Sequence, residues 1–200
     1  MRYGNMSREH EMMAEGYRVT ERLRFSLVSF LAWGIGLWIL GSVIGIVLLI
    51  GYYLLVPPVE KPTIRLGISV WAFGVAFATM LPHEALHALL VKRHGKTCRF
   101  GIGRIGPLPV GIACFTHDSF TRNQWLSTTL APWVVLSVLL LPLLFFWEYG
   151  LQVFAMHWAC CAGDLWGAWH VLRRPHSVFI GDEAEQDRQK VDIVIWEKET

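Results

Sequence analysis

Residues 25–56 read FSLVSFLAWGIGLWILGSVIGIVLLIGYYLLV, and this stretch contains no charged side chain. About 20 consecutive apolar residues are enough for an α-helix to cross the hydrocarbon core of a bilayer. A buried helix of a soluble protein seldom runs so far without a charge, and Pro57 and Pro58 end the stretch. The segment therefore predicts a transmembrane helix and favours a membrane protein over a soluble one.

Three more apolar stretches follow, at residues 66–91, 126–147 and 151–172. Together with the first they predict a mainly α, polytopic membrane protein whose four transmembrane helices occupy residues 25–172. The composition agrees, because 54% of the residues are hydrophobic and only 17% are charged, whereas a soluble domain has about 25% charged residues. Residues 1–24 and 173–200 are expected to be polar tails. The formal net charge of +2 gives no reason to expect a nucleic-acid partner.

The segments outside the apolar stretches are alternately rich and poor in lysine and arginine. The positive-inside rule assigns the loops rich in these residues to the cytoplasm. It therefore places both termini and residues 92–125 in the cytoplasm of a cell-membrane protein. The tail before the first stretch carries Arg2, Arg8, Arg18, Arg22 and Arg24; the first loop carries Lys61 and Arg65; the second carries Lys92, Arg93, Lys96, Arg99, Arg104 and Arg122; the third carries none; and the C-terminal tail opens with Arg173 and Arg174.

The four cysteines, Cys98, Cys114, Cys160 and Cys161, form no CxxC pair. Adjacent cysteines rarely bridge each other, so a disulfide framework is not expected, as in a reducing or membrane-buried setting. The polar N-terminal tail also lacks the short apolar stretch and small-residue cleavage site of a removable signal peptide.

The loop between the second and third stretches has a β pattern. Glycine and proline recur among apolar residues, which predicts a cytoplasmic β-hairpin over about residues 97–116 that turns near Gly106-Pro107. Residues 190–196 alternate between polar and apolar types and could form a strand, whereas GDEAEQD at 181–187 is typical of a solvated turn.

Residues 83–87 read His-Glu-Ala-Leu-His inside the second apolar stretch. Positions four apart lie on one face of a helix, so His83 and His87 can reach one metal ion, and imidazole suits Zn²⁺. Zinc lowers the pKa of a bound water toward ~7. Glu84 could take a proton from that water and pass it to a leaving amine. Ionisable groups are costly in a membrane helix and usually functional, which favours a metal site over buried structural histidines.

A catalytic zinc site usually has three protein ligands and one open position. Asp164 is the best third candidate, because it lies inside the fourth stretch at a depth that roughly matches that of the two histidines. Cys160 and Cys161 precede it by one turn and remain alternative ligands. His157 is two helical turns away, roughly 10 Å, and is expected to be interfacial or structural.

Several of these features together resemble the DUF3267 family of zincin peptidases, which are similar to the M50 site-2-type membrane metalloproteases. The features are the HEALH motif at 83–87, the hairpin after it, Ala131-Pro132 and Gly163-Asp164. The resemblance covers about residues 66–175. It implies zinc ligands at His83, His87 and Asp164, and an extended membrane protein or peptide substrate that pairs with the hairpin edge. Site-2 proteases commonly carry Asn-Pro and Asp-Gly pairs; here Leu165 follows Asp164 and no Asn-Pro occurs, so the resemblance assigns no oxyanion-stabilising residue.

The sequence therefore favours a zinc-dependent membrane endopeptidase with Glu84 as its catalytic residue. One alternative is an inactive, zinc-stabilised membrane scaffold that binds a partner through the hairpin. A metal transporter is disfavoured, because no second row of polar residues lines a path through the predicted helices.

Overall fold

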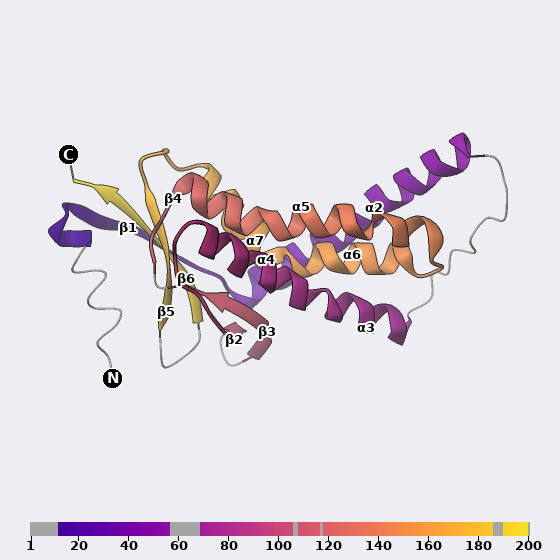
Figure 1. The fold of residues 1–200 in the computed structure, drawn as a ribbon, viewed down its shortest axis with the longest axis horizontal. Coiled ribbons are helices and arrows are strands. Elements are labelled where there is room, and N and C mark those ends of the chain that lie inside the picture. Colours follow the sequence, from indigo (N-terminus) through magenta and orange to yellow (C-terminus); the bar gives the residue numbers. More distant parts are fainter. Residues whose placement is uncertain (1–11, 57–68, 106–107, 117, 186–189, 200) are drawn as a thin grey trace.

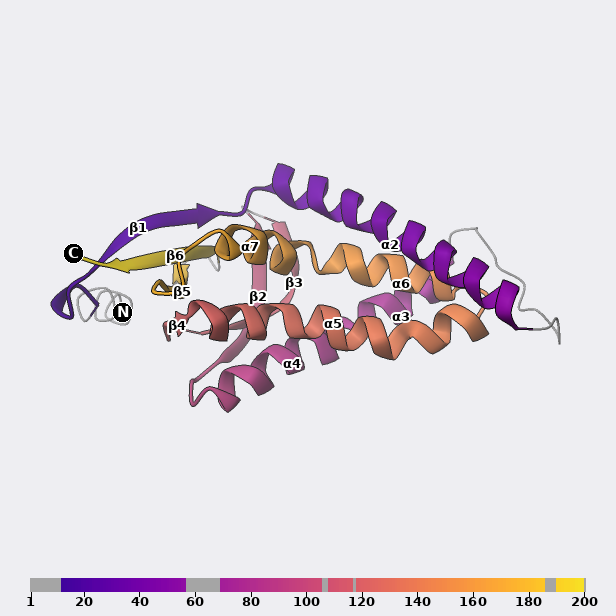
Figure 2. The same cartoon turned by 90° about the horizontal axis from the view of Figure 1, so that it is seen from above.

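The computed structural model describes residues 12–56, 69–105, 108–116, 118–185 and 190–199. The strands gather at one end of the molecule, and the long helices extend from that end in one direction (Figures 1 and 2). Strands β1 and β6, the first and last described elements of the chain, both belong to this group. The elements are β1 (Tyr17–Arg24), α2 (Leu27–Leu55), α3 (Val70–Ala78), α4 (Met80–Arg93), β2 (Arg99–Ile105), β3 (Leu108–Phe115), β4 (Phe120–Thr121), α5 (Arg122–Phe146), α6 (Gly150–Cys160), α7 (Ala162–Leu172), β5 (Phe179–Glu185) and β6 (Lys190–Lys198).

Three helical segments of the described chain are long and apolar enough to cross a membrane. They are Leu27–Leu55, Val70–Arg93, which combines α3 and α4, and Arg122–Phe146. The fourth predicted span, residues 151–172, is divided at Cys161 into α6 and α7. Each of these has 11 residues, which is too short to span a bilayer alone. In space, α5 leads away from the strands, and α6 and α7 return toward them (Figure 2).

Helix α2 packs on α6 through one narrow stripe. Its buried residues Leu37, Gly41, Gly45 and Leu49 are four apart and so lie on one face. Small residues let two backbones approach closely: a Cβ added at Gly41 would lie 3.2 Å from the Cα of Ala155. The remaining faces of α2 expose large apolar side chains, as a lipid-facing helix does.

The strands form one sheet in the order β3-β2-β6-β5-β4, and β1 also pairs with β6. The predicted hairpin is confirmed, because β2 and β3 pair antiparallel, with Phe100 opposite Cys114. Its predicted turn at residues 106–107 lies outside the described residues. Within the described residues, a parallel pairing of Arg104 with Lys190 joins the hairpin to β6.

The two segments expected as polar tails contain strands in their described parts. Residues 17–24 form β1, and the C-terminal segment supplies β5 and β6, which confirms the strand predicted at 190–196. The turn predicted at 181–187 is wrong up to Glu185, because residues 179–185 pair with β6. Residues 186–187 lie outside the described chain. Pairing with a distant strand satisfies backbone groups in a way that local composition does not reveal.

A buried cluster fixes the sheet against α5 and α7. Arg122, at the start of α5, donates hydrogen bonds from Nε to the carbonyl of Val171 (3.2 Å) and from Nη2 to that of Leu172 (2.7 Å). Those carbonyls lie at the end of α7, where helix C-termini have unpaired acceptors. The arrangement therefore holds α7 beside α5 at the strand end of the molecule. The cluster comprises Leu23, Val91, Phe120, Trp125, Leu126, Trp166, Ala168, Val171, Val178, Ile180, Ile193 and Ile195.

Candidate metal centre

Helix α4 carries the HEALH motif and directs both histidines at α7. The Nε2 atoms of His83 and His87 lie 3.2 Å apart. Oδ2 of Asp164 lies 2.9 Å from Nε2 of His83 and 3.4 Å from Nε2 of His87. The structure thus brings together the three side chains that the sequence suggested as zinc ligands. Their role as ligands stays a prediction.

Asp164 occupies the first turn of α7, whereas the sequence placed it inside one continuous helix. The interruption at Cys161 creates a helix N-terminus three residues before Asp164. The unpaired N–H groups there and the helix dipole favour a carboxylate. Its side chain is 23% exposed. The break between α6 and α7 therefore helps to hold a negative charge at a depth where an isolated one would be costly.

His87 is oriented by a carbonyl of α5. Its Nδ1 lies 2.9 Å from the carbonyl oxygen of Thr128. In a regular helix this oxygen would accept the N–H of residue 132, but residue 132 is a buried proline without an N–H. Pro132 therefore leaves the carbonyl available to His87. Because a carbonyl can only accept, Nδ1 carries the hydrogen, and Nε2 presents a lone pair to His83 and Asp164 when the ring is neutral.

The cluster fits a divalent cation. Two imidazole nitrogens and a carboxylate oxygen converge, and a neutral His87 supplies no hydrogen at that point. Ligands ~2.0–2.2 Å from a tetrahedral zinc ion lie roughly 3.3–3.6 Å from one another. The three distances of 2.9, 3.2 and 3.4 Å are within a few tenths of an ångström of that range. Two histidines and one carboxylate are also a usual donor set for catalytic zinc.

Glu84 lies beside the cluster and is bound to the hairpin. Its Oε2 accepts a hydrogen bond of 2.7 Å from the backbone N–H of Cys114 in β3. Its Oε1 lies 4.0 Å from Nε2 of His83. The residue is 7% exposed. Strand β3 thus holds one carboxylate oxygen and leaves the other next to the histidines, where a base would have to lie.

A cavity of about 660 Å³ joins the cluster to the hairpin. Its wall includes His83, Glu84, His87 and Asp164. The rest comes largely from β3 and from aromatic side chains, among them Gly111, Ile112, Ala113, Cys114, Phe115, Phe25, Phe30 and Phe77. A mostly apolar hollow with a few convergent polar groups is typical of a binding site.

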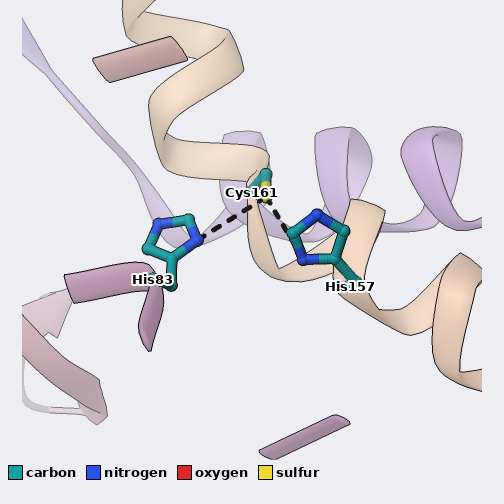
Figure 3. Close-up of side chains that lie close together, drawn as sticks. All are labelled: His83, His157 and Cys161. Atoms are coloured by element: carbon teal, nitrogen blue, oxygen red, sulfur yellow. Dashed lines mark hydrogen bonds between the residues drawn. The ribbon is translucent and has the colours of Figure 1, made fainter. Parts of the chain in front are cut away.

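Cys161, one of the alternative ligands suggested by the sequence, lies on the opposite side of the His83 ring from Asp164. Sγ of Cys161 is 3.9 Å from Nδ1 of His83, the ring nitrogen opposite the one that meets Asp164. It is also 4.0 Å from Nδ1 of His157 (Figure 3). Cys160 lines the cavity. His83 is therefore shared by two groups of possible metal-binding side chains, one with Glu84 and His87 and one with His157 and Cys161.

Comparison with known proteins agrees with this geometry. The model of the DUF3267 family, described as "Putative zincin peptidase", matches residues 76–179, which is more than half of the chain. The chain belongs to the DUF3267 family. The matched range of the DUF3267 chain contains α4, the hairpin, α5, α6 and α7, and hence every side chain of the cluster. No curated protein and no solved structure matches.

Sequence reasoning missed the parts of the DUF3267 site that are made of backbone. The Thr128 carbonyl holds His87, and the Cys114 N–H holds Glu84. Every residue type has a backbone carbonyl, and all but proline have an N–H, so the sequence does not show which of these groups contacts a side chain. One signal was present, because a proline within a predicted membrane helix frees the carbonyl four residues earlier. Which side chain would use that carbonyl depends on how α4 packs against α5.

Proposed function

We propose that this protein is a zinc-dependent membrane endopeptidase that cleaves a peptide bond in or near the membrane. One observation carries the proposal. Nε2 of His83, Nε2 of His87 and Oδ2 of Asp164 converge within 3.4 Å, and the carboxylate of Glu84 lies beside them. The zincin description of the family points to the same chemistry.

In this proposal His83, His87 and Asp164 hold the ion, and Glu84 is the catalytic residue. Zinc, when bound, lowers the pKa of water and polarises a carbonyl. Glu84 accepts the proton of the attacking water at Oε1 and later delivers it to the leaving amine. Its second oxygen stays on the Cys114 N–H, which keeps the carboxylate aimed at the histidines. His83 and Glu84 are buried, which strengthens the electrostatic interactions that they make.

We also infer four membrane crossings, with α6 and α7 together forming the last. Their combined path returns toward the strands, and β1 and β6, the first and last described elements, lie on that side (Figures 1 and 2). The strand side would be the cytoplasmic one, because the loops rich in lysine and arginine belong to it. The cluster lies near this end, so cleavage would take place close to the cytoplasmic surface.

The substrate would be an extended segment of a membrane protein or peptide. One edge of β3 pairs with β2, and the N–H of Cys114 points to the other edge, toward Glu84. N–H groups two residues apart on a strand face the same edge, so Ile112 offers its N–H there as well. An added strand could use this edge while its side chains enter the largely apolar cavity.

Elemental analysis of the detergent-purified protein tests the metal site. We expect about one zinc per chain in the wild type, and its loss in His83→Ala and Asp164→Ala. Zinc retained in Asp164→Ala would show that another residue is the third ligand. No metal in the wild type after incubation with zinc would overturn the proposal.

Glu84→Gln separates a peptidase from the scaffold alternative. Glutamine can still accept the Cys114 N–H through its amide oxygen, but it cannot take up a proton. We expect this variant to keep its zinc and its melting temperature, to lose all cleavage, and to retain bound substrate that can be isolated by crosslinking. A Glu84→Gln protein with full biological activity would favour the scaffold, in which Glu84 merely fastens the hairpin to α4.

A further inference from the structure

His83 is bordered by a chain of buried contacts that leads away from the proposed ion. The chain begins at the carbonyl of Trp133, which lies 3.4 Å from Nε2 of His157. A carbonyl cannot donate, so Nε2 of His157 carries the hydrogen. In neutral His157, Nδ1 is then a lone-pair acceptor. His157 is 1% exposed, so bulk water cannot donate a hydrogen bond to this Nδ1.

Cys161 connects the two histidines. Its Sγ lies 4.0 Å from Nδ1 of His157 and 3.9 Å from Nδ1 of His83 (Figure 3). A thiol has one hydrogen to donate and sulfur lone pairs that accept weakly. If the thiol donates to His157, sulfur is left as an acceptor facing His83. Each contact then joins a donor to an acceptor only when Nδ1 of His83 carries a hydrogen.

We propose that Cys161 and His157 are positioning residues that fix the tautomer of His83, so that its Nε2 lone pair is available to the metal. This inference rests on the proposed zinc site. These contacts act against the effect of Asp164 on the His83 tautomer. Oδ2 of Asp164 lies 2.9 Å from Nε2 of His83 and by itself would favour a hydrogen on that nitrogen. Zinc ligands of this kind usually donate their second N–H to an outer partner, and loss of that partner typically costs 10–100-fold in metal affinity.

Both histidines of the motif are then held in the same way by unrelated elements. His87 gives its Nδ1–H to the carbonyl that Pro132 frees in α5. His83 gives its Nδ1–H to the sulfur at the junction between α6 and α7. Cys161 is fully buried and His83 is 3% exposed. The alternative, a second ion between Cys161 and the two Nδ1 atoms, would require His83 to lose both ring hydrogens while ligating two cations.

The test compares Cys161→Ala and Cys161→Ser with Cys98→Ala as the control, because Cys98 is a partly buried thiol outside the cavity wall. Each full-length protein is purified in detergent. Zinc stoichiometry is measured by elemental analysis, and affinity by competition with a chromogenic chelator. We expect Cys161→Ala to keep one zinc per chain with affinity about 10–100-fold weaker. Serine, which can donate and accept, should recover part of the loss, and Cys98→Ala should bind like the wild type. His157→Phe removes the acceptor of the thiol hydrogen and should weaken binding in the same direction.

A second readout separates positioning from simple packing. Nitrogen-15 shifts of the histidine rings report which nitrogen is protonated. They are measured with selectively labelled histidine in zinc-free protein that carries Asp164→Ala, because the carboxylate would otherwise favour a hydrogen on Nε2 of His83. We expect the His83 signals to move toward the Nε2–H tautomer in Cys161→Ala but not in Cys98→Ala. This readout holds even if the wild type fails to bind zinc, a result that would overturn the proposed function but not the role of Cys161.

Three results would overturn the inference. One is an unchanged affinity and an unchanged His83 tautomer in Cys161→Ala. Another is a second zinc in the wild type that Cys161→Ala removes. The third is a sulfur-to-metal charge-transfer band in the cobalt-substituted protein that disappears in Cys161→Ala. The last two would make Cys161 a ligand.

Discussion

Replacing Pro132 by alanine should maintain or raise the stability of the zinc-free protein and weaken its affinity for zinc. Alanine restores an N–H at residue 132, which can bond to the Thr128 carbonyl within α5. Proline inside a helix costs about 3 kcal/mol relative to alanine. The variant also loses two buried ring methylenes, at about 0.8 kcal/mol each, because Pro132 is almost fully buried. The zinc-free protein should therefore be no less stable than the wild type, and up to about 1–2 kcal/mol more stable.

Zinc binding should weaken in the same variant, because the new N–H competes with His87 for the carbonyl. The contact at risk is the 2.9 Å hydrogen bond from Nδ1 of His87. A hydrogen bond of this type contributes about 0.5–1.5 kcal/mol, which corresponds to about a 2- to 13-fold loss of affinity. Competition with a chromogenic chelator measures the affinity, and thermal melting in the presence of a strong chelator measures the stability.

Pro142→Ala is the matched control, because Pro142 lies in the same helix but is exposed and outside the cavity wall. It should leave zinc affinity unchanged. If Pro132→Ala binds zinc as tightly as Pro142→Ala does, the freed carbonyl does not orient His87 and the reasoning fails.

Four further outcomes are expected. Gly41→Val should destabilise the protein by about 1–3 kcal/mol, because its side chain would press on the backbone of Ala155. Gly51→Val is the control, because nothing lies within 4 Å of a Cβ added there, and it should melt like the wild type. Equal effects at the two positions would refute the α2–α6 contact. Arg122→Met should lower stability by about 3 kcal/mol through the loss of two charge-assisted hydrogen bonds to Val171 and Leu172, and an unchanged melting curve would show that this contact is dispensable. Saturating zinc at 100 times the dissociation constant should stabilise the wild type by about 2.7 kcal/mol, and Asp164→Asn should abolish that increment; a full zinc-induced shift in Asp164→Asn would exclude the carboxylate as a ligand. Single cysteines placed at Lys61 and at Arg173 in a cysteine-free background should react with an impermeant thiol reagent from opposite sides of the membrane, and labelling from one side would rule out the proposed topology.

Local patterns made several features predictable. The charge-free run at 25–56 indicated a membrane helix, because length and polarity alone decide whether a segment can cross a bilayer. The spacing of His83 and His87 indicated one metal-binding face, because helical geometry fixes where positions four apart lie. Glycine and proline among apolar residues indicated the hairpin, and alternation of side chains indicated β6. Each of these rests on a rule that acts over a few residues.

Non-local contacts escaped the same reasoning. Strand β1 and most of β5 read as polar tails, and only their pairing with β6 makes them strands. Along one straight helix His157 is too far from Asp164 to share its ion, so the sequence predicts only an interfacial or structural role for His157. The interruption at Cys161 and the packing of α4 instead bring Cys161 within 4.0 Å of both His83 and His157.

The sequence by itself determined the membrane class, the HEALH motif and the choice of Asp164 as the third candidate, since each follows from residue type and spacing. The tertiary structure decided which atoms face the site. It placed the Thr128 carbonyl on His87, the Cys114 N–H on Glu84 and the Cys161 sulfur on His83. Such contacts depend on the packing of α4 against α5, α7 and β3, and the orientation of a hydrogen-bond partner across elements is not encoded at any one position along the chain.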